Sequence, residues 1–187
     1  LTFCSSFARV RFAEFDAAGN PFGVDVDIGL ALADYLGLEP DVQEVLFHDL
    51  IGAVVDLRCD IAISGHFITQ ERLAQVALIP YREGRISPVV LAGNPLAVET
   101  LADLCGQQVA IVAGTIYHDI IRGLGEYTGE GVDQQCAQAG APMVTLTEFE
   151  TEDEAVASLP ANDSTAFIGN EASAVDRSTE VEVSVAE

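Results

Sequence analysis

The chain has 187 residues, which is enough for one large domain or for two small lobes with buried cores. It carries 30 Asp and Glu against 8 basic residues, all of them Arg, for a formal net charge of −22. This charge repels nucleic acid and anionic membrane surfaces, so we expect neither as a partner. Charged residues interrupt every apolar run before ~18 residues, so we expect no membrane insertion.

The start of the chain and the cysteines bear on the cellular compartment. The residues from Leu1 on are typical of a strand rather than of a signal peptide, so either a leader has been removed or the chain is part of something longer. Cys4, Cys59, Cys105 and Cys136 form no C-x-x-C pair and have no His at metal spacing, so we expect no metal and no cofactor. Cys105 and Cys136 could lie at one sheet edge as a disulfide, although buried free thiols fit equally well.

The first part of the chain alternates between strand and helix patterns. A strong turn signal lies within residues 14–21, between short extended pieces. The pattern predicts strands at residues 1–5, 42–45 and 61–63, and helices at residues 27–36, ended by Gly37, and 49–57. This alternation favours a parallel α/β sheet.

An extended stretch at residues 80–95, with a strand at 86–91, precedes a second α/β pattern. We expect strands at 109–112, 143–146, 165–168 and 181–185, a helical turn at 101–104, and helices at 115–124 and 152–159. The chain is therefore predicted to be a two-lobed α/β protein, each lobe a parallel or mixed sheet flanked by helices. We expect lobe 1 at residues 1–82, the connection at 83–95 and lobe 2 at 96–180. Loops beyond the carboxyl ends of strands should face a cleft between the lobes.

The segment after the predicted strand at 61–63 combines three features of an anion site. Gly65 lets the backbone approach a ligand closely, and Thr69 is a suitable N-cap for a short helix. Arg72 would then lie in the first helical turn, where a cation opposes the helix dipole unless an anion is bound nearby. From these residues alone, an ordinary turn with a surface Arg is the plainer interpretation.

Residues along the whole chain fit one known pattern. In the first lobe they are Phe12, Asp16, Gly19, residues 23–27, Phe47, residues 49–51, residues 60–63, residues 68–72, Pro80 and Tyr81. In the second lobe they are residues 101–104, Gly106, Val109, Gly114, Thr115 and residues 166–170. In this order they resemble the extracytoplasmic solute-binding proteins of polar amino-acid ABC transporters (family 3), which have the type II periplasmic-binding-protein fold.

The resemblance implies a role for five positions. Arg72 would bind the α-carboxylate of the ligand through both arms of its guanidinium. Gly65 and Phe67 would offer backbone groups beside it. Thr115 would close on the same carboxylate from the second lobe. Phe47 would form an apolar wall.

Five positions depart from the family pattern. Phe67 and Ile116 stand where the family often has a hydroxyl that bonds the carboxylate. Asn170 replaces the Asp that usually contacts the ligand's ammonium, and Arg9 takes the lid position that is often aromatic. Ser6 occupies a side-chain-sensing position where some relatives carry an acid. A pocket that gains a cation and loses an anion predicts an acidic amino acid or a related organic acid, unless Arg9 points to solvent.

The resemblance implies a periplasmic or otherwise extracytoplasmic protein without catalytic activity. It would bind a small carboxylate ligand, and a membrane permease or receptor would recognise the closed form. Family members continue beyond residues 181–185 and complete the first lobe, so the resemblance implies that residues 181–187 begin a return to lobe 1 and that the rest of this return is missing here.

Two alternatives stay open. A cyclohexadienyl-dehydratase-like enzyme would need a general acid, for which His66, Glu14 and Glu171 are the candidates. The other alternative is an interaction module that has lost ligand binding.

Overall fold

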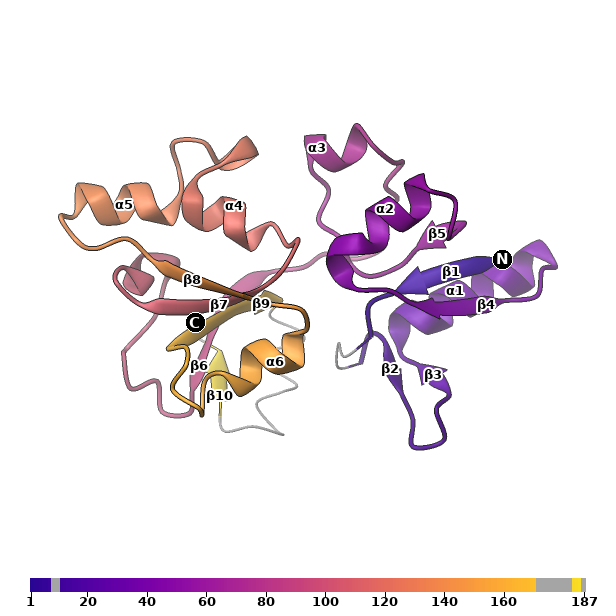
Figure 1. Cartoon of the computed structure of the whole chain (residues 1–187), viewed down its shortest axis with the longest axis horizontal. Coiled ribbons are helices and arrows are strands. Elements are labelled where there is room, and N and C mark those ends of the chain that lie inside the picture. The colour runs from indigo at the N-terminus through magenta and orange to yellow at the C-terminus, as the bar shows by residue number, and fades with distance from the viewer. Residues whose placement is uncertain (8–10, 171–182, 186–187) are drawn as a thin grey trace. The chain divides into compact units, whose positions relative to one another are not determined.

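A computed structural model describes residues 1–7, 11–170 and 183–185 of the chain. The chain divides into two compact units, Leu1–Glu83 and Gly84–Glu187 (Figure 1). Two residues singled out by the sequence, Arg9 and Glu171, lie outside the described residues.

Unit 1 contains a three-stranded parallel sheet in the order β4–β1–β5. The strands are β1 (Thr2–Ser5), β4 (Asp41–Glu44) and β5 (Ile61–Ala62). A small antiparallel hairpin, β2 (Glu14–Phe15) and β3 (Pro21–Phe22), forms around the predicted turn. The helices are α1 (Val24–Leu36), α2 (Leu50–Val55), which the 3-10 turn η1 (Phe47–Asp49) precedes, and α3 (Gln70–Leu73).

Helix α1 begins three residues earlier than predicted, because Gly23 starts it in a conformation that other residues avoid. Gly23 has φ 117°, and a Cβ there would lie 2.5 Å from the carbonyl oxygen of Phe12. Gly37 ends the helix in the left-handed conformation, as predicted. Gly29 lets α1 pack on β1, since a Cβ at this position would lie 2.7 Å from the ring of Phe3. The core of unit 1 contains Phe3, Phe7, Ala13, Val26 and Ile63.

Unit 2 contains a five-stranded mixed sheet in the order β10–β6–β9–β7–β8. Strand β7 (Gln108–Val112) runs parallel to β8 (Thr145–Phe149) and β9 (Ala166–Asn170). Strand β6 (Ile86–Leu91) runs antiparallel to β9 and β10 (Val183–Val185), so the strand expected in the connection lies inside this sheet. The helices are η2 (Leu101–Leu104), α4 (Tyr117–Arg122), η3 (Gly125–Tyr127), α5 (Val132–Gln138) and α6 (Glu152–Ala157).

The alternating α/β architecture predicted from the sequence is thus confirmed, with differences in unit 2. Helix α4 stops at Arg122 because Gly123 takes the left-handed conformation. Helix α5 was missed because its sequence is mostly polar, and it buries only Val132, Asp133 and Cys136. Strand β8 begins two residues later than expected, since polar contacts hold Val144 just before it.

All four cysteines are paired. Cys105 and Cys136 form a disulfide that ties the end of η2 to α5. Cys4 and Cys59 form a second disulfide, between the central strand β1 and the loop before β5. The sequence left this second pairing open.

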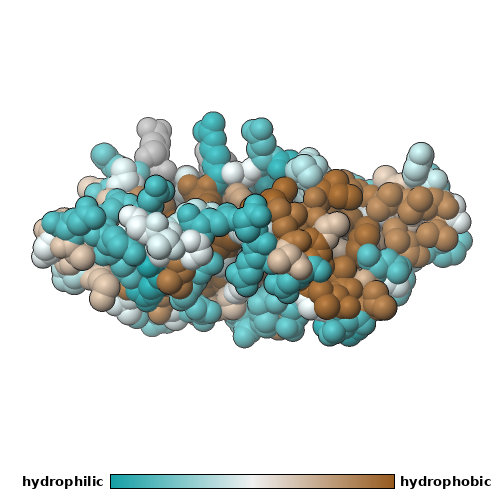
Figure 2. Space-filling view, turned by 90° about the horizontal axis from the view of Figure 1, so that it is seen from above, coloured by the Kyte–Doolittle hydropathy of each residue, from teal (hydrophilic) through white to brown (hydrophobic). Residues whose placement is uncertain are grey.

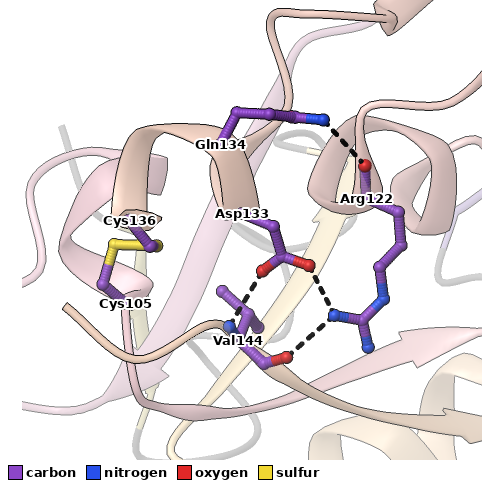
Figure 3. A network of polar contacts seen from close by, with 6 residues as sticks. All are labelled: Cys105, Arg122, Asp133, Gln134, Cys136 and Val144. Atoms are coloured by element: carbon purple, nitrogen blue, oxygen red, sulfur yellow. Dashed lines mark hydrogen bonds and ion pairs between the residues drawn. A yellow bond between two sulfur atoms is a disulfide. The ribbon is translucent and has the colours of Figure 1, made fainter. Parts of the chain in front are cut away.

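One buried carboxylate organises the region beside α5 (Figure 3). Asp133 accepts a hydrogen bond from Nη1 of Arg122 at 2.6 Å and another from the backbone N of Val144 at 2.9 Å. The same Nη1 donates to the carbonyl of Val144 at 3.0 Å, and Nε2 of Gln134 donates to the carbonyl of Arg122 at 3.3 Å. The network joins the end of α4, the start of α5 and the approach to β8.

Apolar exposure differs strongly between the two units. Among the described residues, every exposed large hydrophobic except Leu96, Leu124 and Met143 belongs to unit 1. Figure 2 shows brown, apolar side chains gathered on the unit 1 side of the face it presents. Within the described part of the chain, no helix is long and apolar enough to span a membrane.

A partly buried polar pair joins the start of α1 to the last residues of unit 1. Asp25, in the first turn of α1, is fully buried and accepts a hydrogen bond of 2.7 Å from the hydroxyl of Tyr81. Burial of the phenol, the negative charge of Asp25 and the hydrogen bond between them raise the pKa of Tyr81 from 10.0 to about 12.

Replacing Asp133 by Ala should destabilise unit 2. The substitution leaves the partly buried Arg122 without its carboxylate and the backbone N–H of Val144 without its acceptor, and the expected cost is about 2–4 kcal/mol. Denaturant unfolding with the disulfides intact measures it. Asp163→Ala, at an exposed loop position, serves as the control and should leave the midpoint unchanged. Equal midpoints for the two variants would show that the network contributes nothing.

Tyr81 should titrate in a late step. Tyr81 holds its proton more tightly in the folded than in the unfolded chain, so its contribution to stability is fully present below pH 10 and is lost as the pH rises through about 12. Near-ultraviolet phenolate absorbance follows the titration. Tyr81→Phe should reduce the late absorbance change by one phenol, whereas Tyr35→Phe, at a strongly exposed position, should leave it unchanged.

Candidate functional site

Strands β1 and β5 are parallel neighbours, with Phe3 opposite Ile61. Their carboxyl ends therefore lie at the same edge of the unit 1 sheet. The buried hydroxyl of Ser5 donates to the carbonyl of Ile63 at 2.6 Å and fastens the two strand ends together. The backbone N of Ser6 donates to Oγ of Ser64 at 3.3 Å. The loops that follow both strands are therefore held side by side. The sequence had not singled out Ser5 or Ser64.

Arg72 projects from α3, which follows the β5 loop. Arg72 is buried, with 9% of its surface exposed, and its Nη1 donates to the carbonyl of Phe67 at 2.8 Å. Thr69 caps the helix as predicted, since its Oγ1 accepts from the backbone N of Arg72 at 3.2 Å. The hydrogen bond to Phe67 holds the guanidinium, a planar donor group, in place. The best partner of such a group is a carboxylate, because a guanidinium can bind both carboxylate oxygens.

The helix-dipole argument made from the sequence does not apply to Arg72. Helix α3 has four residues, so Arg72 lies as much in its last turn as in its first. The carbonyl of Phe67 accepts a hydrogen bond from the guanidinium and so restrains it. The carbonyl of Phe67 therefore helps to orient Arg72, and the role of Phe67 beside the ligand stays a prediction.

An aromatic pair lies in the same region of unit 1. The ring of Phe47, from η1, stacks on the ring of His66 with centroids 4.2 Å apart and planes 9° from parallel. Phe47 is 8% exposed, and Gly65 precedes His66 with φ 59°. The left-handed turn at Gly65 directs the chain from β5 toward this pair. The sequence had assigned the wall to Phe47 alone.

Unit 2 brings two of the predicted residues to a single sheet edge. Thr115 follows β7 and Asn170 ends β9, and these two strands are parallel. The hydroxyl of Thr115 donates to the carbonyl of Val112 at 2.6 Å, so binding a carboxylate through this hydroxyl requires that bond to exchange. Ile116 and Asn170 are both buried, and each residue is 4% exposed.

The candidate general acids have structural contacts. The ring of His66 stacks on Phe47, and the carboxylate of Glu14 accepts from the backbone N of Arg11 at 2.8 Å. Glu171 lies outside the described residues, as does Arg9. Among the residues that the structure describes, no group of three or more His, Cys, Asp or Glu could hold a metal ion.

Family membership follows from the sequence itself. The profile of the bacterial extracellular solute-binding proteins, family 3, matches residues 2–178. The chain belongs to this family. The fold and the order of the motifs agree with that assignment.

Two relatives illustrate the similarity. The probable ABC transporter arginine-binding protein ArtJ of Chlamydia trachomatis serovar D is 30% identical over 62% of this chain and 45% of its own length. The ABC transporter arginine-binding protein 1 of Escherichia coli K12 is 32% identical over 65% of this chain and 49% of its own length. The chain thus spans about half the length of these relatives.

Solved structures show the same fold. Holo ArgBP from T. maritima matches with a TM-score of 0.82 and 24% identity, covering 100% of this chain and 76% of that one. An ancestral arginine-binding protein bound to glutamine matches with a TM-score of 0.84 and 25% identity, covering 99% and 76%. The family resemblance and two-lobed fold class predicted from the sequence are therefore confirmed. The acidic preference finds no support, because the relatives are arginine-binding proteins.

Removing the α3 cap should loosen Arg72. Thr69→Ala eliminates the acceptor for the backbone N–H of Arg72 and should cost about 1 kcal/mol of local stability. Amide hydrogen exchange at Arg72 measures the change, which should be faster in the variant. Thr69→Ser keeps the hydroxyl and should exchange at the original rate. If both variants exchange alike, the cap does not hold Arg72.

Proposed function

We propose that this chain captures an amino acid for ABC-type uptake, outside the cytoplasm, with Arg72 binding the α-carboxylate. The buried guanidinium of Arg72, oriented by the carbonyl of Phe67 at the edge where β1 and β5 end, is the observation that carries the proposal. The ring pair of Phe47 and His66 would pack against the aliphatic part of the ligand. Family membership supports binding rather than chemistry.

In this proposal, the edge of unit 2 completes the site. Thr115 would turn its hydroxyl from Val112 to the carboxylate, and Asn170 would accept a hydrogen bond from the ammonium. Gly65, Ser6 and Ile116 would shape the remaining walls. A ligand that contacts both units would favour the closed state, and a membrane permease would recognise that state.

The charge of the protein bears on the ligand's side chain. A net charge of −22 attracts a cationic ligand and repels a dianionic one, apart from any local contact. The relatives point the same way, since they are arginine-binding proteins and one similar structure has glutamine bound. We therefore propose a basic or neutral polar amino acid in place of the acidic ligand first predicted.

A thermal-shift screen with the proteinogenic amino acids tests the proposal. A ligand at ~100 times its dissociation constant adds about 2.7 kcal/mol, which for a chain of this size raises the melting temperature by roughly 5–10 °C. L-Arginine or L-glutamine should give this shift and L-glutamate a smaller one. A shift with L-glutamate alone would instead restore the acidic prediction.

Variants of Arg72 identify the anchor. Arg72→Ala should abolish the ligand-induced shift, measured against the variant's own melting temperature, and Arg72→Lys should weaken binding at least about tenfold because an ammonium cannot form the bidentate contact. Arg58→Ala removes an exposed Arg of the same unit and should behave like the wild type. A shift that survives in Arg72→Ala would rule out this anchor. If no amino acid gives a shift, the protein is better described as a non-binding module.

A further inference from the structure

The turn between α6 and β9 carries a sequence motif that ligand capture does not use. Residues 162–164 are Asn-Asp-Ser, which fits the pattern Asn-x-Ser/Thr with a middle residue other than Pro. This pattern is the acceptor motif for N-linked glycans on exported proteins. No other Asn of the sequence has a hydroxyl residue two positions later. Because so short a motif also arises by chance, it needs support from the structure around it.

The fold presents Asn162 to solvent. Residues 160–163 are all exposed, and Asn162 has a φ of 61°, in the left-handed region that Asn adopts more readily than most residues. Backbone hydrogen bonds close the turn. The N of Asn162 donates to the carbonyl of Leu159 at 3.1 Å, and the N of Asp163 donates to the carbonyl of Ser158 at 3.0 Å. A bulky, hydrophilic glycan on Asn162 would extend into water and displace no core side chain.

The hydroxyl of Ser164 has no evident role in the folded chain. Ser164 is 3% exposed, and its Oγ has no hydrogen-bond partner among the described residues. By contrast, the nearby hydroxyls of Ser158 and Thr165 donate to backbone carbonyls at 2.6 and 2.8 Å. A buried hydroxyl without a partner costs free energy, so the fold alone gives no reason for Ser rather than Ala here. The glycosylation motif does give one, because it requires a hydroxyl two residues after the Asn.

Within unit 2, the turn and the candidate site residues lie at opposite edges of the sheet. The turn leads into the amino end of β9, where the backbone N of Thr165 donates to the carbonyl of Gln108 at the start of β7, at 2.8 Å. Thr115 and Asn170 lie instead at the carboxyl ends of these two parallel strands. A glycan on Asn162 would therefore leave the unit 2 part of the candidate site open.

We propose that Asn162 is the acceptor of an N-linked glycan, added during export before the turn closes. The amide nitrogen of Asn162 forms a bond to C1 of the first sugar of a lipid-phosphate-linked oligosaccharide. The bond from that carbon to the phosphate oxygen breaks, and the released phosphate takes the proton that the amide loses. Transfer precedes folding, since the hydroxyl of Ser164 is buried once the turn has formed. This modification rests on the extracytoplasmic location in the proposed function, because the transferase acts on exported chains.

Mass spectrometry of the protein purified from its own organism tests the proposal. The proteolytic peptide that contains Asn162 should be heavier by the mass of a glycan, and fragmentation should place the added mass on this residue. Asn162→Gln, expressed in the same cells, should lose the added mass. Asn20→Gln, at an exposed Asn that Pro follows, is the matched control and should keep it. An unmodified Asn162 peptide in the wild-type protein would overturn the proposal.

A second variant separates the motif from the shape of the turn. Ser164→Ala keeps Asn162 and removes only a hydroxyl that has no partner in the described part of the chain. It should lose the added mass, yet unfold at the same denaturant midpoint as the equally unmodified Asn162→Gln. A glycan that persists on Ser164→Ala would show that the motif does not direct the modification, and the proposal would fail.

Cell fractionation distinguishes this proposal from the proposed function. Wild-type protein found outside the cytoplasm with an unmodified Asn162 would overturn the glycan and leave ligand capture standing. Wild-type protein confined to the cytoplasm would overturn both. A glycosylated protein that gives no thermal shift with any amino acid would support the glycan and overturn ligand capture.

Discussion

The register between β1 and β5 places Phe3 opposite Ile61 and Cys4 opposite Ala62, so both strands end at the same edge of the unit 1 sheet. The buried hydroxyl of Ser5 and the disulfide from Cys4 then fasten this arrangement. Because the chain leaves β5 at that edge, the loop that leads to α3 and Arg72 begins beside the end of β1. Parallel pairing thus sets where this loop begins, and a slip by one residue would turn the side chains of β5 to the other face of the sheet.

Buried polar groups serve a similar purpose in each unit. In unit 2, Asp133 joins two helices and the approach to a strand through Arg122 and Val144. In unit 1, Asp25 joins the start of α1 to the exit of the chain through Tyr81. A buried carboxylate without hydrogen bonds is costly, so each pair specifies one arrangement out of several that apolar packing alone would permit. These two buried carboxylates thus have a local structural role in a chain whose net charge is −22.

The sequence was a good guide wherever the signal was local. The helix stop at Gly37, the N-cap at Thr69 and the strand over β6 are all observed as predicted, because each depends on backbone preferences of neighbouring residues. Helix α5 was missed because it lacks such a local signal: its few apolar residues show no helical period. Family motifs then supplied Arg72, whose local context alone had favoured a surface residue.

What the sequence by itself determined is the α/β alternation, the family and the identity of the candidate anchor. Only the tertiary structure decided that Phe67 orients Arg72, that His66 stacks on Phe47 and that Cys4 pairs with Cys59. Residue periodicity and capping signals extend over a few positions. Contacts such as the one between Cys4 and Cys59, 55 residues apart, depend on how whole strands and helices pack, and no local pattern in the chain encodes that packing.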